Sequence, residues 1–256
     1  MKLKNYYWYY KSIIPPEICQ KIIDAGENQL KFYKETGVDT NAYTSGNKEK
    51  QSNPKAVSSK GLSENELSKL KKTKKTYIRD SQVAWLDETW LYDLINPLID
   101  NANTQAGWRW NLNGSEKFQF TKYNKDGLYG WHEDGQSDWH AVYKRYMPGL
   151  SKVTKDKNNR LPDPYTEDKS LIGKVRKISM TLNLNKPGEY KGGDLKFDFG
   201  LHTEEKNRFY TCEEIRPQGS LIVFPSFLKH CVTPITKGTR YSLVLWSLGE
   251  PWVWAS

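Results

Sequence analysis

Cysteine and long apolar runs are scarce in this sequence of 256 residues. The three cysteines, Cys19, Cys212 and Cys231, are widely spaced and form no CxxC pair. They predict neither a disulfide framework nor a structural zinc site, and they indicate a reducing compartment. No run approaches the roughly 20 apolar residues of a membrane-spanning helix, and the first residues lack the apolar core of a secretory signal. We therefore expect a cytoplasmic protein without a membrane segment.

Acidic residues are outnumbered by basic ones, which leaves a formal net charge of +9. An acidic partner such as nucleic acid is compatible with that charge. Much of the excess, however, lies in lysine-rich stretches such as residues 69–75, which are typical of a solvated surface and need no partner. Aromatic residues make up 13% of the chain, and this richness favours β-structure with an aromatic-lined cavity.

The spacing of apolar residues divides the chain into two parts. Residues 1–107 predict a strand over 6–14, a helix from Glu17 to about Leu30, a strand over 81–85, and a helix from Thr89 to Gln105 that Pro97 kinks or breaks. From Trp108 onward the period becomes two, which predicts further strands over 118–123, 178–184, 195–199, 220–224 and 240–246.

These elements predict one mainly β domain over residues 1–256, built as an antiparallel barrel or jelly roll. Residues 1–107 form its N-terminal support and residues 108–249 its core. Two polar segments are expected as long loops near the site: residues 37–76, with a short helix over 64–72, and an insertion over 144–174.

A short histidine–acid motif stands at the end of one predicted strand. His132 and Asp134 are two residues apart, so in extended chain they point to the same side, while Glu133 points away. A second histidine, His230, begins a later strand. Two imidazoles and one carboxylate form the facial triad of non-haem Fe(II) oxygenases, which leaves open positions on the metal. Alone, the HxD pair is a weak signal.

Arg240 makes the motif more specific. It lies ten residues after His230, beyond a segment with Pro234 and Gly238 that we interpret as hairpin-like, and it begins the strand over 240–246. A guanidinium placed there can hold a carboxylate with two parallel hydrogen bonds. Without the aligned His230, a surface arginine would be the better interpretation.

Three stretches resemble the prolyl 4-hydroxylase-type branch of the 2-oxoglutarate/Fe(II) oxygenases, especially its bacterial and phage PKHD-type hydroxylases. They are FQFTKYNKDGLYGWHED, RKISMTLNLNKPGEYKGGDLKF and GSLIVFPSFLKHCVTPITKGTRYSLVLWSLG, which occur in the family's order. The resemblance implies a double-stranded β-helix with helices packed on one side. It also implies a bacterial cell or a phage-infected host as the setting.

The resemblance assigns roles to individual positions. His132, Asp134 and His230 match the iron ligands, and Arg240 matches the residue that binds the distal carboxylate of 2-oxoglutarate. The weaker matches are Tyr123 and Ser179 on the co-substrate side, and Trp246 and Tyr129 on the substrate side; Tyr123 and Trp246 are equally compatible with a place in the core. The glycines and acid of residues 192–194 match a structural turn, whereas His140 and Asp138 are expected as polar loop residues rather than ligands.

The implied activity is a dioxygenase that uses Fe(II), 2-oxoglutarate and O2, with ascorbate as a candidate reductant. It would hydroxylate an aliphatic C–H, by resemblance a prolyl residue of a protein or peptide, and release succinate. A free amino acid or other small amine remains open as the substrate. Two alternatives compete with this function. A nucleic-acid demethylase of the same superfamily is disfavoured because Trp246 stands where that group has a second arginine, and a non-catalytic jelly-roll module would not need Arg240.

Overall fold

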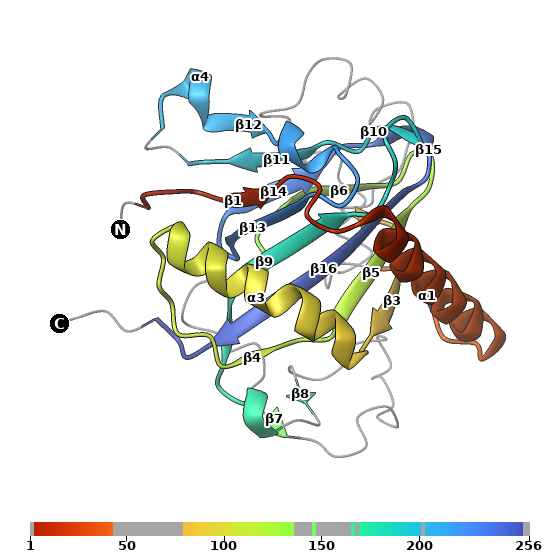
Figure 1. Ribbon diagram of the computed structural model, residues 1–256, viewed down its shortest axis with the longest axis horizontal. Helices are drawn as coiled ribbons and strands as arrows, with labels where there is room; N and C mark the ends of the chain where they lie inside the picture. Colours follow the sequence, from red (N-terminus) through yellow and green to blue (C-terminus); the bar gives the residue numbers. More distant parts are fainter. Residues whose placement is uncertain are drawn as a thin grey trace, which may run out of the picture.

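Two antiparallel sheets form the centre of the molecule, as the computed structural model shows for residues 3–42, 79–135, 145–146, 165–166, 169–200 and 203–252 (Figure 1). The larger sheet has the order β1 (Trp8–Tyr10), β13 (Leu221–Pro225), β9 (Val175–Asn183), β16 (Arg240–Gly249), β5 (Phe118–Tyr123) and β3 (Gln82–Leu86), and β4 (Gly114–Ser115) also pairs with β16. The smaller sheet has the order β12 (Phe209–Thr211), β11 (Leu195–Asp198), β14 (Lys229–Val232), β6 (Leu128–His132) and β2 (Arg79–Asp80).

The two sheets pack face to face at one end through aromatic side chains. The ring of Phe197 on β11 meets that of Phe224 on β13 edge-on, with 5.1 Å between the ring centres. Two short pairs are also present in the part of the chain that the structure describes, β10 (Tyr190–Gly192) with β15 (Ile235–Gly238) and the parallel pair β7 (Arg145–Tyr146) with β8 (Tyr165–Thr166). The fold is the predicted jelly roll of the double-stranded β-helix type.

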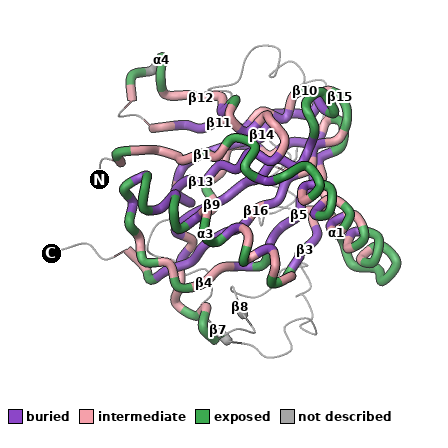
Figure 2. The backbone as a smooth tube through the Cα atoms, in the orientation of Figure 1, coloured by how far each residue is buried: buried purple, intermediate pink, exposed green. Residues whose placement is uncertain are grey.

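Two helices, α1 (Pro16–Glu35) and α3 (Thr89–Gln105), cover the outer face of the larger sheet (Figure 1). The sheet is therefore buried on both faces (Figure 2). Alternation along β5 shows the consequence, because Phe118 and Phe120 are fully buried in the core that includes the helices, whereas the residues between them face the other sheet. The remaining helices within the described residues are short: α4 (Glu205–Arg208) and 3-10 turns at Lys169–Leu171 and Glu213–Ile215.

The structure corrects three details of the sequence prediction. The first strand is only β1, because the backbone turns at Ser12, whose φ is +47°. Helix α3 does not break at Pro97, which lies on the exposed side where water can hydrogen-bond the carbonyl that the proline leaves free. The segment before Arg240 is no simple hairpin turn, since it contains β15, which pairs with β10.

Both expected loops fall largely outside the described residues. This holds for most of residues 37–76, including the predicted helix over 64–72, and for most of the insertion over 144–174. Asp138 and His140 also lie outside the described residues. Within the described part of the chain, no helix is both long enough and apolar enough to cross a membrane.

Gly26 is where α1 approaches the larger sheet most closely. A Cβ atom at this position would overlap the ring of Phe120 on β5. Gly26→Ala should therefore lower the free energy of unfolding by about 1–3 kcal/mol, because the packed ring has no room to move. Urea unfolding measures the loss, and Asn28→Ala on the exposed side of the same helix is the matched control. Equal midpoints for the two variants would contradict this packing.

Candidate metal and co-substrate site

The pairing of β6 with β14 brings two histidines from distant parts of the chain together. His132 is the register partner of His230, and 4.2 Å separates their ring centres. Asp134 joins them because the chain turns back after β6, where the backbone N–H groups of Asp134 and Gly135 both donate to the carbonyl of Ser226 at 2.9 Å. Gly135 permits this turn, since a Cβ atom there would lie 2.8 Å from the carbonyl oxygen of Arg176.

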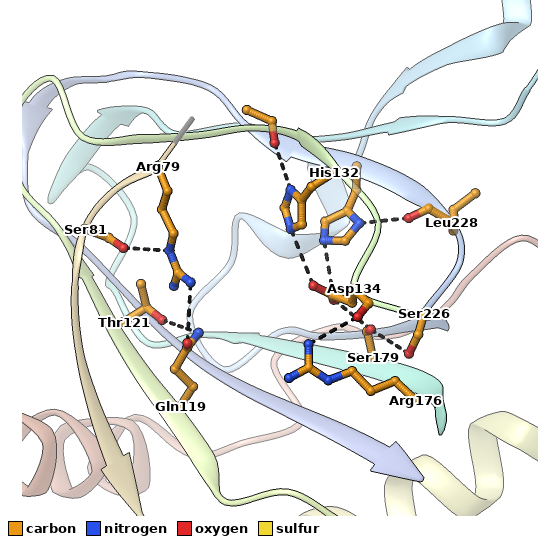
Figure 3. Close-up of polar contacts among 12 residues, drawn as sticks. Arg79, Ser81, Gln119, Thr121, His132, Asp134, Arg176, Ser179, Ser226 and Leu228 are labelled. Carbon is orange, nitrogen blue, oxygen red and sulfur yellow. Dashed lines mark hydrogen bonds and ion pairs between the residues drawn. The ribbon is translucent and has the colours of Figure 1, made fainter. Parts of the chain in front are cut away.

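The three side chains present ligand atoms to one point. The Nε2 atom of His132 lies 3.4 Å from Asp134 Oδ1, that of His230 lies 3.5 Å from Oδ2, and all three ligand atoms fall within 4.8 Å of one another. Each Nδ1–H donates to a backbone carbonyl two residues earlier at 2.8 Å, which leaves Nε2 free to bind a metal (Figure 3). Two imidazoles and a carboxylate fit a divalent iron.

Burial and mutual charge set the protonation of these ligands. Burial alone would raise the pKa of Asp134, but His230, His132 and Arg176 outweigh it and hold that pKa well below its ordinary value. Burial, together with His132, lowers the pKa of His230 to about 4. Asp134 is therefore ionised and His230 neutral at pH 7, which is the state that a metal requires of them.

Arg240 and Tyr123 stand opposite each other on β16 and β5, and both line the same pocket as the triad. Arg240 is 1% exposed, and its Nη1 donates to Ser242 Oγ at 3.2 Å. Its Nε has no hydrogen-bond partner, and no carboxylate of the described residues pairs with the guanidinium. Since an unpaired buried charge is costly, this site fits an anionic ligand such as the distal carboxylate of 2-oxoglutarate.

The turn beside Arg240 explains why two glycines stand together in the sequence. Gly192 and Gly193 have φ values of +73° and +63°, and a Cβ atom on Gly193 would lie 3.1 Å from Arg240 Cδ. Asp194 then ties the loop together by accepting from Thr233 Oγ1 and from Arg216. The structural interpretation of residues 192–194 agrees with these contacts.

The pocket has a floor made by two adjacent strands. Alternate residues of β16 from Arg240 to Trp246 line it, and so do Gln119 and Tyr123 of β5. In the β5–β16 register Arg240 is opposite Tyr123 and Val244 is opposite Gln119. One end of the floor therefore carries the buried arginine, and the other end carries Gln119 and Trp246.

The weaker sequence assignments take different places. Tyr129 lines the pocket with its ring stacked on His132 at 3.5 Å between centres, and burial raises its pKa to about 12, so the phenol stays protonated. Trp246 also lines the pocket, and its indole N–H is buried without a partner. Ser179 is not among the pocket-lining residues but lies beside Asp134, to whose Oδ2 its hydroxyl donates at 2.7 Å (Figure 3).

Sequence reasoning missed three residues around the site. Arg79 on β2 lines the pocket, although its only sequence signal is a lone arginine just before a predicted strand. Arg176 and Glu116 form a bidentate pair with distances of 2.5 and 2.7 Å. The Arg176 guanidinium also donates to the Asp134 carbonyl at 3.2 Å and lies 3.9 Å over the Trp246 ring, so it holds both residues in place.

A family model described as the 2OG-Fe(II) oxygenase superfamily matches residues 118–248, which include the triad and Arg240. The chain belongs to the 2OG-Fe(II) oxygenase superfamily. Fe(II), 2-oxoglutarate and O2 are thus the metal, co-substrate and oxidant of its family, as the resemblance implied.

Curated relatives share part of this chain. A PKHD-type hydroxylase of Picosynechococcus is 30% identical over 105 residues, covering 41% of this chain and 40% of the relative. The PKHD-type hydroxylase YbiX of Escherichia coli is 37% identical over 129 residues, covering 50% of this chain and 40% of the relative. The chain therefore matches less than half the length of each of these relatives.

Solved structures with low sequence identity share the fold. A viral collagen prolyl hydroxylase from Paramecium Bursaria Chlorella virus-1, in complex with 2OG, has a TM-score of 0.52 at 15% identity and covers 96% of this chain and 97% of its own. A prolyl hydroxylase from Trichoplax adhaerens, in complex with a hypoxia-inducible-factor peptide fragment, has a TM-score of 0.51 at 16% identity and covers 95% of this chain and 83% of its own.

The lowered pKa of His230 predicts how stability depends on pH. Unfolding returns this histidine to its ordinary pKa of 6.5, so between pH 6.5 and about 4 the unfolded chain binds a proton that the folded protein excludes. As the pH is lowered through that window, the free energy of unfolding of the metal-free protein should decrease, by up to about 1.4 kcal/mol per pH unit from this group. His230→Gln should reduce this dependence of the unfolding free energy on pH, measured by urea unfolding at several pH values. The same pH dependence in the variant and the wild type would contradict the lowered pKa of His230.

The hydroxyl of Ser179 should tune the metal site without binding the metal. Ser179→Ala removes the hydrogen bond to Asp134 Oδ2, so we expect the dissociation constant for Fe(II) to rise about 10- to 100-fold, measured by anaerobic titration. Ser247→Ala, a buried serine on β16 outside the pocket lining, is the control. An unchanged affinity in Ser179→Ala would show that Asp134 is oriented without it.

Proposed function

We propose that this protein is a dioxygenase that hydroxylates an aliphatic C–H while converting 2-oxoglutarate to succinate and CO2. One observation carries the proposal: the buried guanidinium of Arg240 lacks an anion and lines the same pocket as the His132, Asp134 and His230 cluster. A module that only bound a metal would supply no anion to pair with this guanidinium. A prolyl residue of a protein or peptide is the proposed substrate, supported by the prolyl hydroxylases that share the fold.

Each residue of the pocket has a part in this reaction. His132, Asp134 and His230 would hold Fe(II), which when bound supplies, with 2-oxoglutarate and O2, the oxidising chemistry of the family. Arg240 would receive the distal carboxylate of 2-oxoglutarate, and Tyr123 across the strand pair would pack beside it. This fixes the orientation of the co-substrate.

The substrate side of the pocket is formed by Tyr129 and Trp246. Both rings are held rigidly, the first by stacking on His132 and the second beneath the guanidinium of Arg176. Rigid aromatic walls exclude water and keep the target C–H in one position relative to the metal. The Trp246 position carries no second arginine, which supports a hydroxylase over a nucleic-acid demethylase.

Two substitutions test the activity through different parts of the site. Asp134→Ala should reduce Fe(II)-dependent succinate formation at least 100-fold, because the metal loses its carboxylate ligand. Arg240→Gln should raise the KM for 2-oxoglutarate about 100-fold, because a charge-assisted bidentate contact is lost. Succinate is measured by mass spectrometry, with Asp100→Asn on the exposed side of α3 as the control. Undiminished succinate production by Asp134→Ala would refute the proposed function.

A further inference from the structure

The pocket contains a second guanidinium besides that of Arg240. Arg79 at the start of β2 lines the pocket together with the triad and Arg240. Its Nε donates to Ser81 Oγ at 2.9 Å, and its Nη1 reaches Gln119 Oε1 at 3.5 Å, a long contact. Within the described part of the chain no carboxylate forms an ion pair with Arg79. Donors of this guanidinium are therefore free to bind an anion in the pocket.

The surroundings of Arg79 fix its position relative to the metal ligands. The guanidinium carbon lies 4.5 Å above the ring centre of Tyr129, whose ring is stacked in turn on His132 at 3.5 Å. Only one aromatic ring thus separates this guanidinium from a metal ligand. The hydroxyl of Ser81 holds the guanidinium from a second direction (Figure 3). Such a guanidinium is preorganised, so it loses little freedom when it binds a ligand.

Arg79 and Arg240 contact different ends of the pocket floor. Arg240 is opposite Tyr123 at one end of β5, whereas Arg79 reaches Gln119 four residues along the same strand. The Gln119 end is also the end toward Trp246, whose buried indole N–H has no partner. Four residues of extended strand span roughly 13 Å, which favours a separate anionic group for each arginine. The pocket therefore offers two separate places for carboxylates.

The net charge of the pocket also favours the binding of a second anion in addition to 2-oxoglutarate. Among the described residues, the charged side chains that line the pocket are Arg79, Arg240 and Asp134, which sum to one positive charge when the histidines are neutral. A divalent metal and dianionic 2-oxoglutarate cancel each other, so one positive charge remains in the loaded site. A monoanionic substrate neutralises it, whereas a neutral substrate leaves the charge of Arg79 without an anion.

We propose that Arg79 binds a carboxylate belonging to the substrate, so that the hydroxylated carbon is part of an amino-acid unit with a free α-carboxylate. The proposal rests on the proposed hydroxylase activity, and it assigns as substrate a free amino acid or the C-terminal residue of a peptide rather than a residue within a chain. The closeness of Arg79 to His132 supports it, since a carboxylate bound there lies only a few bonds from a carbon that faces the metal. Trp246 supplies a further donor at the same end.

Paired acids and amides test this assignment. The probes are the common L-amino acids, L-proline with L-prolinamide, and alanyl-alanyl-proline with a free or an amidated C-terminus. We expect 2-oxoglutarate-dependent gains of 16 daltons for acids and not for the matching amides, and the free amino acids and the peptide distinguish the two sources. Arg79→Gln should raise the KM for the acid about 10- to 100-fold with a smaller change in kcat, and Arg79→Lys should partly restore it.

A binding measurement separates this proposal from the proposed function. Calorimetric titration of the anaerobic Fe(II)- and 2-oxoglutarate-loaded protein should show that the wild type binds the acid more tightly than the amide, and that Arg79→Gln loses the preference. Lys237→Gln, which removes an exposed charge of the same sign on β15, is the matched control. Equal binding of acid and amide, or an unchanged preference in Arg79→Gln, would overturn the proposal while succinate formation stands. Arg79-dependent binding of the acid without any succinate formation would refute only the oxygenase activity.

Discussion

The pairing of β6 with β14 is the constraint on which the site depends. It places His132 opposite His230, and the turn that follows β6 returns Asp134 to the same point through two hydrogen bonds to the Ser226 carbonyl. Backbone geometry, rather than attraction between the ligands, brings the three side chains together. Ligands held in this way are arranged before the metal arrives, which reduces the ordering that binding requires.

Two buried polar groups without hydrogen-bond partners lie in the pocket where ligands are expected. The Nε of Arg240 and the indole N–H of Trp246 are buried without hydrogen bonds, and both residues line the pocket. Elsewhere near the site, buried charge is compensated, as in the bidentate pair of Arg176 and Glu116. Among the described residues, three further buried polar atoms without partners belong to Glu88, Tyr190 and Glu214 outside the pocket, so only the two within it bear on ligand binding.

The sequence predicted the fold class from strand periodicity, and it predicted the triad from the HxD spacing, the aligned His230 and Arg240, and the resemblance to a known family. Strand periodicity and the HxD spacing correspond directly to the strands and to the orientation of His132 and Asp134. Arg240 lines the pocket as its interval from His230 predicted, even though β15 lies between them. The role of Arg79 could not be predicted, since it depends on which strand pairs with β6, and no local pattern records that. Ser179 was assigned to the co-substrate side, whereas its contact with Asp134 depends on the approach of β9 to the turn after β6.

Because both faces of the larger sheet are buried, alternate residues of each central strand have different roles: one set packs in the core and the other lines the pocket. On β16, Leu243 and Leu245 pack in the core with the helices, while Ser242 and Val244 line the pocket. The residues that keep the sheet folded are therefore different from those that meet a ligand. Mutations on the inner positions can change which molecules fit while leaving the helical layer intact, so this architecture lets substrate preference diverge within a lineage at little cost in stability.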